Sequence, residues 1–194
     1  GGYLLRARFG GAENTWPLWI VAPFQADEFA GFTLEDPRGV FDDLKATGAD
    51  GLVTTRLGAS AERGMVFLLD EGTLPMPFWR EAAYEFRNDR FWEPTGLRDA
   101  WARWMPMTPD CALDLSKLAQ AYPGWEFETL MNRIDVRTYA EHPILVRAVK
   151  GTSEMLVTTL RPFGGLGISP RGVTKNPSGV EMMRHYIRWL MATR

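Results

Sequence analysis

Short apolar runs, each ended by glycine or proline, recur along the chain and predict β-strands. In residues 3–9 the charged Arg6 and Arg8 alternate with apolar residues, which is the period-two pattern of a half-buried strand. The run at 18–22 is almost continuously apolar, as in strands that are covered on both faces. The predicted strands span residues 3–9, 18–22, 51–55, 64–69, 131–139, 144–150 and 154–161.

Helical spacing of apolar residues predicts four helices. Asp36-Pro37 has the signature of a helix start, and apolar residues then repeat at helical spacing as far as Gly48. Shorter helices are predicted at 97–105 and, with Asp110 as the cap, at 110–122.

The fourth helix begins either at Asn176-Pro177 or at Ser178, where Glu181 completes a capping box. His185 is expected on its polar side, together with Arg184 and Arg188. Its predicted buried stripe comprises Val180, Met183, Ile187, Leu190 and Met191.

The order of these elements predicts the fold class. The first third alternates strand, helix and strand, which favours a parallel sheet with helices on its faces. Near the end of the chain, the Lys150-Gly151 turn joins two β-rich runs, so residues 144–161 are predicted to form an antiparallel hairpin. We therefore expect an α/β fold with a mostly parallel sheet and an antiparallel C-terminal hairpin.

The composition narrows the class of protein. With 194 residues, 45% hydrophobic and 24% charged, the chain has the size and composition of one globular domain. A formal net charge of −2 provides no surplus of cations for a nucleic-acid backbone, so no nucleic-acid partner is expected.

No apolar run approaches the ~20 residues of a membrane helix and no signal-peptide pattern is present, which predicts a soluble protein without a membrane partner and leaves its compartment open. The start GGYLL, without an initiator methionine, suggests a tag remnant or a piece of a longer protein.

Glycines after the strand at 154–161 raise the question of a phosphate site. A dinucleotide fingerprint needs its glycines directly between a strand and a helix, but Pro170 follows Gly165 and Gly167, and the helix starts about ten residues later. No Gly-Lys-Ser/Thr sequence follows the glycines, which argues against a P-loop. We expect no cofactor and interpret the glycines as an irregular excursion with unusual backbone angles.

Candidate catalytic groups are few. Cys111 is the single cysteine, and it lies at a predicted helix start rather than at the glycine-flanked elbow that is typical of a nucleophile. Only His142 and His185 could act as its base. Two histidines and one cysteine without close spacing do not predict a metal site, and the acidic residues include no isolated pair suited to glycoside hydrolysis.

A charged stripe and a group of tryptophans are candidates for ligand binding. Period-two alternation puts Arg133, Asp135 and Arg137 on one face of the predicted strand 131–139, where they either line a cleft or form an ion-pair network. Tryptophans of the proline-rich middle either stack on sugar rings or anchor a loop on the core. The structural interpretation is favoured for both groups. The candidate ligand-binding residues are Trp92, Trp101, Trp104, Arg137, Tyr139 and Arg161.

Five segments together resemble the C-terminal region of glycoside hydrolase family 2 proteins of the β-galactosidase-like type. They are NTWPLWIVAP, RGMVFLLDEGTLPMPFWREAAYEF, NRIDVRTYAEHP, LVTTLRPFGGLG and NPSGVEMMRHYIRWL, spread over most of residues 13–193. In those multidomain proteins a β-sandwich precedes a module similar to class I glutamine amidotransferases. The resemblance implies a flavodoxin-like three-layer sandwich over residues 16–194, with residues 1–15 as a linker or as the terminal strand of a preceding β-sandwich.

In such a fold, the two LVTT segments would end at the same carboxyl edge of the sheet. Their threonines and the following arginine would then surround the crevice where doubly wound folds place ligands. These residues are Thr54, Thr55, Thr158, Thr159 and Arg161.

The resemblance transfers little catalytic function to this chain. The family's catalytic glutamates belong to a (β/α)₈ barrel that alone needs ~250 residues, and the amidotransferase triad needs an elbow cysteine and a His-x-Glu pair that the sequence lacks. The resemblance implies a non-catalytic accessory domain that packs against other domains of a larger glycoside hydrolase, with carbohydrate binding as a secondary role. Two alternatives stay open: an amidotransferase-like hydrolase that uses Cys111 or the cluster of Asp135, Arg137 and His142, and a carbohydrate-binding module with a tryptophan platform.

Overall fold

The computed structural model covers the 194-residue chain and describes it in segments. The described residues are 2–29, 35–36, 38–48, 53–54, 56–58, 62–69, 73–75, 82–93, 107–109, 111–165 and 170–192. The helix predicted at 97–105 and the candidate residues Thr55, Trp101 and Trp104 lie outside these ranges.

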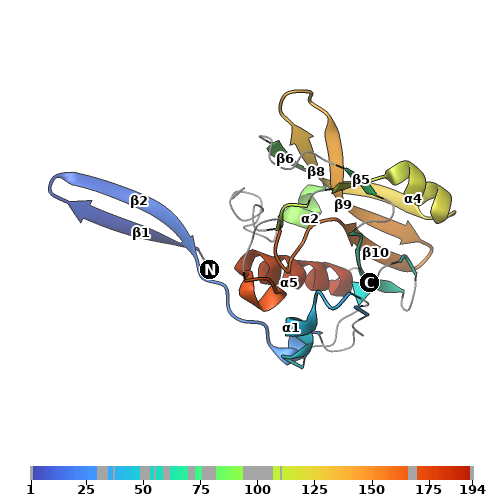
Figure 1. The fold of residues 1–194 in the computed structure, drawn as a ribbon, viewed down its shortest axis with the longest axis horizontal. Helices are drawn as coiled ribbons and strands as arrows, with labels where there is room; N and C mark the ends of the chain where they lie inside the picture. The colour runs from blue at the N-terminus through green and yellow to red at the C-terminus, as the bar shows by residue number, and fades with distance from the viewer. Residues whose placement is uncertain are drawn as a thin grey trace.

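The chain begins with a β-hairpin that projects from the rest of the molecule (Figure 1). Strand β1 (Gly2–Phe9) pairs antiparallel with β2 (Ala12–Trp19), and Gly10 in the turn between them has a φ of +58°. Glycine adopts this left-handed conformation without strain, and hairpin turns of type II′ require it at their first central position. The strand predicted at 3–9 is confirmed, but it is exposed along its whole length and not half-buried as expected. The strand predicted at 18–22 is wrong, because β2 ends at Trp19 and is largely exposed.

Six strands form the central sheet in the order β3-β4-β10-β9-β8-β6. β3, β4 and β10 run parallel to one another, whereas β9 is antiparallel to both β10 and β8, and β8 is antiparallel to β6. The predicted C-terminal hairpin is confirmed as the pairing of β9 with β10. The bounds are β3 (Val53–Thr54), β4 (Arg63–Phe67), β6 (Ala82–Phe86), β8 (Glu126–Asp135), β9 (Glu141–Lys150) and β10 (Ser153–Thr158).

The expected flavodoxin-like three-layer sandwich with a mostly parallel sheet is wrong. Of the five pairings described in the central sheet, two are parallel and three are antiparallel. A further small antiparallel sheet joins β5 (Thr73–Pro75) to β7 (Cys111–Leu113). The error arises at one side of the sheet, where β8 pairs antiparallel with both β9 and β6, and no strand was predicted at the position of β6. The strand-helix-strand alternation of the first third applies to β3 and β4 and does not extend to these long-range pairings.

Each face of the central sheet has its own apolar cluster. Side chains alternate along a strand, so Leu156 of β10 joins the cluster under α5 (Pro177–Ala192), while its neighbour Val157 joins the cluster with α4 (Leu115–Ala121). The helix α5 lies across the sheet in Figure 1. None of the helices in the described ranges is long and apolar enough to cross a membrane.

The helix α5 confirms the strongest helical pattern of the sequence. It begins at the Asn176-Pro177 step, one of the two predicted starts, and proline is favoured there because the first helical turn needs no N–H from it. Gly179 lies directly on the preceding chain: a Cβ at this position would stand 2.0 Å from the carbonyl oxygen of Pro162. Glycine therefore permits a close approach that no other residue would allow.

Two residues of α5 differ from the prediction. His185, expected on the polar side, is only 5% exposed, and Met191, expected in the core, is 51% exposed. The buried face is wider than the predicted stripe, because the short helix α2 (Asp89–Trp92) packs beside the sheet and its Phe91 ring meets His185 edge-on at 4.5 Å.

The helix predicted at 110–122 is wrong in its first residues. Residues Cys111–Leu113 form β7, and α4 begins only after Asp114, whose carboxylate accepts a hydrogen bond from the backbone N–H of Lys117 at 3.1 Å. Asp114 thus takes the capping role that the sequence suggested for Asp110.

Three single-turn helices complete the described structure. The helix predicted from Asp36-Pro37 to Gly48 is regular only in α1 (Asp42–Lys45), and the Asp36 carboxylate accepts hydrogen bonds from the N–H groups of Val40 and Phe41 just before it. The two 3₁₀ turns are η1 (Ala26–Phe29) and η3 (Val173–Lys175).

Candidate functional site

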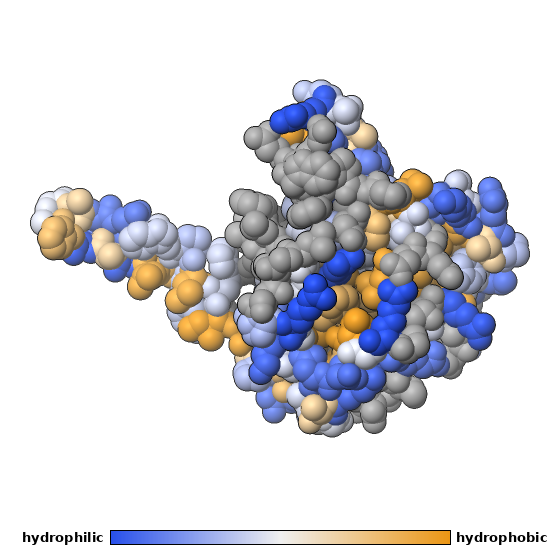
Figure 2. All heavy atoms as spheres, in the orientation of Figure 1, coloured by the Kyte–Doolittle hydropathy of each residue, from blue (hydrophilic) through white to orange (hydrophobic). Residues whose placement is uncertain are grey.

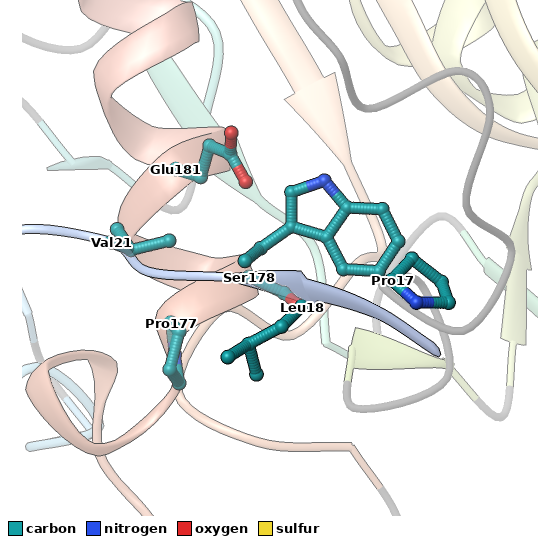
Figure 3. A pocket seen from close by; sticks show the side chains of 7 residues that line it. Pro17, Leu18, Val21, Pro177, Ser178 and Glu181 are labelled. Atoms are coloured by element: carbon teal, nitrogen blue, oxygen red, sulfur yellow. The ribbon is translucent and has the colours of Figure 1, made fainter. Parts of the chain in front are cut away.

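A hollow of about 250 Å³ lies where the projecting hairpin joins the body (Figure 3). In Figure 3, Pro17 and Leu18 come from β2, and Pro177, Ser178 and Glu181 come from the first turns of α5. We call this hollow the hairpin-base pocket. Its lining residues are Pro17, Leu18, Trp19, Val21, Pro177, Ser178 and Glu181.

Local sequence explains how these side chains converge. Ser178 and Glu181 are three residues apart on α5, so they lie on the same side of the helix. Trp19 is paired with Gly2 across the hairpin. Gly2 has no side chain, which leaves room for the indole: a Cβ at Gly2 would lie 3.5 Å from the Trp19 Nε1. Val21 follows in the segment without regular secondary structure that leads from β2 into the body.

An arginine on α5 holds this connecting segment in place. Arg184 donates from its guanidinium to the carbonyl oxygen of Ala22 at 2.6 Å and to the carboxylate of Glu28 at 2.7 Å. Its guanidinium also lies over the Phe24 ring at 5.1 Å. The hydrogen bond from Arg184 lowers the pKa of the Glu28 carboxyl and, in turn, raises the pKa of Arg184. The pocket therefore has one fixed wall on α5 and an entering chain that is tied to the same helix.

The pocket lining combines an aromatic ring and apolar side chains with two polar side chains. Trp19 supplies an aromatic ring, and Leu18, Val21 and the two prolines supply apolar surface. The Ser178 hydroxyl can donate or accept a hydrogen bond, and the Glu181 carboxylate can only accept. Within this lining the single formal charge is that of the Glu181 carboxylate, and Arg184, one turn further along α5, attracts it.

The structure places Trp92 in the core. The indole is 1% exposed, its Nε1–H donates to the carbonyl oxygen of Leu130 at 2.9 Å, and it meets the rings of Phe86 and Phe91 edge-on. A buried ring has no face for a sugar, so Trp92 anchors α2 on the sheet.

Arg137 and Tyr139 lie on an exposed turn between β8 and β9. Asp135, the last residue of β8, accepts hydrogen bonds from the backbone N–H groups of Arg137 at 2.8 Å and Thr138 at 3.1 Å. Tyr139 has a φ of +56° and is 79% exposed. The predicted charged stripe is therefore divided: Arg133 is buried in the strand, whereas Asp135 shapes the turn that carries Arg137.

Residues at the end of β10 are buried rather than arranged around an open crevice. Thr54, Thr158 and Thr159 are at most 1% exposed, and the Thr158 hydroxyl donates to the carbonyl oxygen of Ile144 at 2.7 Å. Arg161 is half-buried, and its backbone N–H donates to the carbonyl oxygen of Met107 at 3.0 Å. The two LVTT segments end at the same edge of the sheet, because β3 and β10 both run parallel to β4, but β4 lies between them.

The candidate nucleophile and bases lie in three different elements. Cys111 is buried in β7 with its sulfur 4.0 Å from the carbonyl oxygen of Leu69. His142 lies in β9 opposite Arg133, and His185 lies in α5 among aromatic rings. Burial lowers the pKa of His185 to about 4 from an ordinary value of 6.5. No group of three or more metal-binding side chains occurs among the residues that the structure describes.

Sequence reasoning missed the hairpin-base pocket. The signal was present in NTWPLWIVAP, where prolines and tryptophans alternate, but the partner residues lie more than 150 positions further along the chain. Only the tertiary packing of residues 20–28 on α5 brings the two sides together.

Comparisons with known proteins give no match: no family model matches the chain, and neither the curated proteins nor the solved structures contain a significant match.

Proposed function

We propose that this chain is a non-catalytic accessory domain of a larger carbohydrate-active enzyme and packs against a neighbouring domain through its N-terminal hairpin. The observation that carries the proposal is the sidedness of that hairpin. By cross-strand pairing, Tyr3, Leu5 and Phe9 of β1 share one face with Trp16 and Leu18 of β2. We call these five residues the hairpin apolar face.

The hairpin apolar face is open to solvent. All five side chains are exposed, and Phe9 near the turn is 93% exposed. Figure 2 shows hydrophobic side chains gathered along one side of the projecting hairpin. The opposite face is polar at its outer end, where Arg8 and Glu13 form an ion pair, and it carries one exposed apolar side chain, Leu4, nearer the body.

Energetics favour a covered face. A two-stranded hairpin alone is marginally stable at best in water and needs a further strand or a packed element. From their exposed fractions, the five side chains present on the order of 600 Å², close to the ~800 Å² that each partner buries in a standard interface. A single domain seated on this face would therefore form an interface of ordinary size.

The geometry of the hairpin favours another β-sheet as its partner. Alternating apolar residues on one face of a pair of strands match sheet-on-sheet packing, in which inner faces interdigitate at ~10 Å. Pro17 removes an N–H from β2, and proline in a sheet is confined to positions that need no ladder hydrogen bond. Packing on the face is thus favoured over addition of a strand beside β2.

The carbohydrate context of the proposal rests on the sequence resemblance to the C-terminal region of glycoside hydrolase family 2 proteins. The environments of the reactive side chains support a non-catalytic role, since the Cys111 thiol lies in a small buried strand and the His185 ring is enclosed by aromatics. Neither lies on a strand-to-helix elbow of the kind that nucleophilic hydrolases use.

The reading frame that encodes residues 1–194 tests the proposal. We expect it to extend upstream of Gly1 into a β-rich domain and a catalytic barrel. A start codon immediately before this segment, with no such domain in the same frame, would refute the accessory role.

Turnover by the purified chain gives an independent test. We expect no hydrolysis of p-nitrophenyl galactosides, glucuronides or mannosides and no release of ammonia from glutamine. Turnover that disappears in Cys111→Ser would instead establish the amidotransferase-like alternative.

A further inference from the structure

We propose that the hairpin-base pocket binds one neutral pyranose ring, with the C–H face of the sugar on the Trp19 indole. This inference rests on the proposed carbohydrate context and deepens it by naming a binding site and its ligand class. The tryptophan concerned is not among the candidates Trp92, Trp101 and Trp104 that the sequence suggested.

The size of the pocket sets the size of the ligand. Its volume of about 250 Å³ is below the ~300–1,000 Å³ typical of pockets for drug-sized ligands. One six-membered ring suits this space, whereas a disaccharide would have to extend into solvent. The pocket would therefore hold a terminal residue of a glycan or a free monosaccharide.

The apolar part of the lining fits the less polar side of a pyranose. Aromatic rings carry negative charge on their faces, which attracts the weakly positive axial C–H groups of a sugar. Pro17, Leu18 and Pro177 extend this apolar wall around the ring edge. Because the prolines are rigid, they lose little conformational freedom on binding.

The polar part of the lining fits sugar hydroxyls. The Glu181 carboxylate accepts hydrogen bonds, and the Ser178 hydroxyl one turn before it can donate or accept. Charged acceptors form stronger hydrogen bonds than neutral ones, so Glu181 should contribute more than Ser178. The same carboxylate repels a uronic acid at close range, and Arg184 offsets only part of this repulsion from one turn away, which makes a neutral sugar the expected ligand.

Nuclear magnetic resonance of the ¹⁵N-labelled chain tests the site. The probes are the methyl glycosides of galactose, glucose and mannose, together with glucuronic acid and tetramethylammonium chloride. We expect the indole N–H signal of Trp19 to shift with at least one neutral glycoside, with a dissociation constant on the order of millimolar as befits a single ring. Glucuronic acid should bind at least about fivefold more weakly than the glucoside, because Glu181 repels its carboxylate.

Matched variants separate the pocket from the rest of the surface. Trp19→Ala should abolish the response, and Phe9→Ala, at the far end of the hairpin apolar face, should leave it unchanged. Glu181→Gln should weaken the neutral sugar about tenfold and remove the discrimination against glucuronic acid, whereas Glu126→Gln in β8 should change neither. Trp19→Phe retains a ring and should retain weak binding if the alanine variant loses its fold.

Several outcomes would overturn the inference. They are the lack of any Trp19 shift with every neutral glycoside, an equal response in Trp19→Ala with its fold intact, and a stronger response to tetramethylammonium, which would identify a cation site instead. A Trp19 shift in a chain whose reading frame encodes no larger enzyme would refute the proposed function and leave the sugar site standing. A reading frame that encodes a larger enzyme, together with no Trp19 shift, would refute the sugar site and leave the proposed function standing.

Discussion

The guanidinium of Arg184 in α5 binds the carboxylate of Glu28, 156 residues earlier in the chain. Through this ion pair and its hydrogen bonds to the carbonyl oxygens of Ala22 and Pro23, one side chain holds the segment between β2 and η1 against the last helix. The orientation of the hairpin and the width of the hairpin-base pocket both depend on this attachment.

Replacing Arg184 with methionine should release the connecting segment while keeping apolar bulk over Phe24. Both partners of the ion pair are mostly buried, so the loss of charged hydrogen bonds should lower the free energy of unfolding by about 1–3 kcal/mol. Urea denaturation measures this change. Arg188→Met, one turn further along and exposed, is the control and should change stability by less than about 0.5 kcal/mol.

The contribution of Glu28 should depend on pH. Because the hydrogen bond from Arg184 depresses the folded-state pKa of Glu28, its stabilisation is present above the unfolded pKa near 4.5 and is lost as the pH falls through the folded value. Wild type should therefore exceed Glu28→Gln in stability at pH 6, and the two curves should converge in acid. A constant difference between them down to pH 2 would contradict this account.

His185 should reduce stability in mild acid. Its folded pKa is lowered to about 4 by burial, whereas the ordinary value is 6.5, so the unfolded state takes up a proton first as the pH falls. Stability should decline between pH 6.5 and 4, by about 3 kcal/mol at most from this residue. His185→Phe fits the aromatic surroundings and removes a buried Nε2 that lacks a hydrogen-bond partner among the described residues, so its stability should be flatter across this interval. An unchanged slope in the variant would show that another group causes the decline.

Gly179 should tolerate no side chain. A Cβ would stand 2.0 Å from the carbonyl oxygen of Pro162, and a backbone atom cannot move aside cheaply. Gly179→Ala should cost about 3 kcal/mol or more of stability, measured by thermal or urea unfolding, despite the higher helix propensity of alanine. Gly11→Ala, whose new Cβ would meet nothing within 4 Å, is the matched control and should be nearly neutral.

The sequence predicts the local elements better than their assembly. The hairpin of β9 and β10 and the helix α5 follow from a glycine turn and a proline start, which are short-range signals. The direction of β3, β4 and β10 relative to the rest of the sheet depends on long-range pairing, so a flavodoxin-like order could not be distinguished from the mixed sheet. His185 illustrates the same limit, because its burial comes from Phe91 of α2 and not from its own helix.

The candidate site shows more clearly the difference between what short-range signals predict and what tertiary contacts decide. Trp92 was a candidate because it is aromatic, but only the structure, in which its indole N–H donates a hydrogen bond to the carbonyl oxygen of Leu130, shows that it is a core anchor. Trp19 was not among the candidate ligand-binding residues of the sequence, because Ser178 and Glu181 reach it only through the fold. Composition can mark aromatic residues as candidates, but tertiary contacts decide which of them faces a ligand.

Hydrogen exchange at residues 2–19 tests the central claim of a docking hairpin most directly. In the isolated chain, the amides of β1 should exchange far faster than those of β9 and β10, because the whole strand is exposed. In the complete enzyme, covering of the hairpin apolar face should slow their exchange at least about a hundredfold, and Trp16→Glu should abolish this protection. Equal exchange of β1 in the isolated chain and in the complete protein would contradict the account.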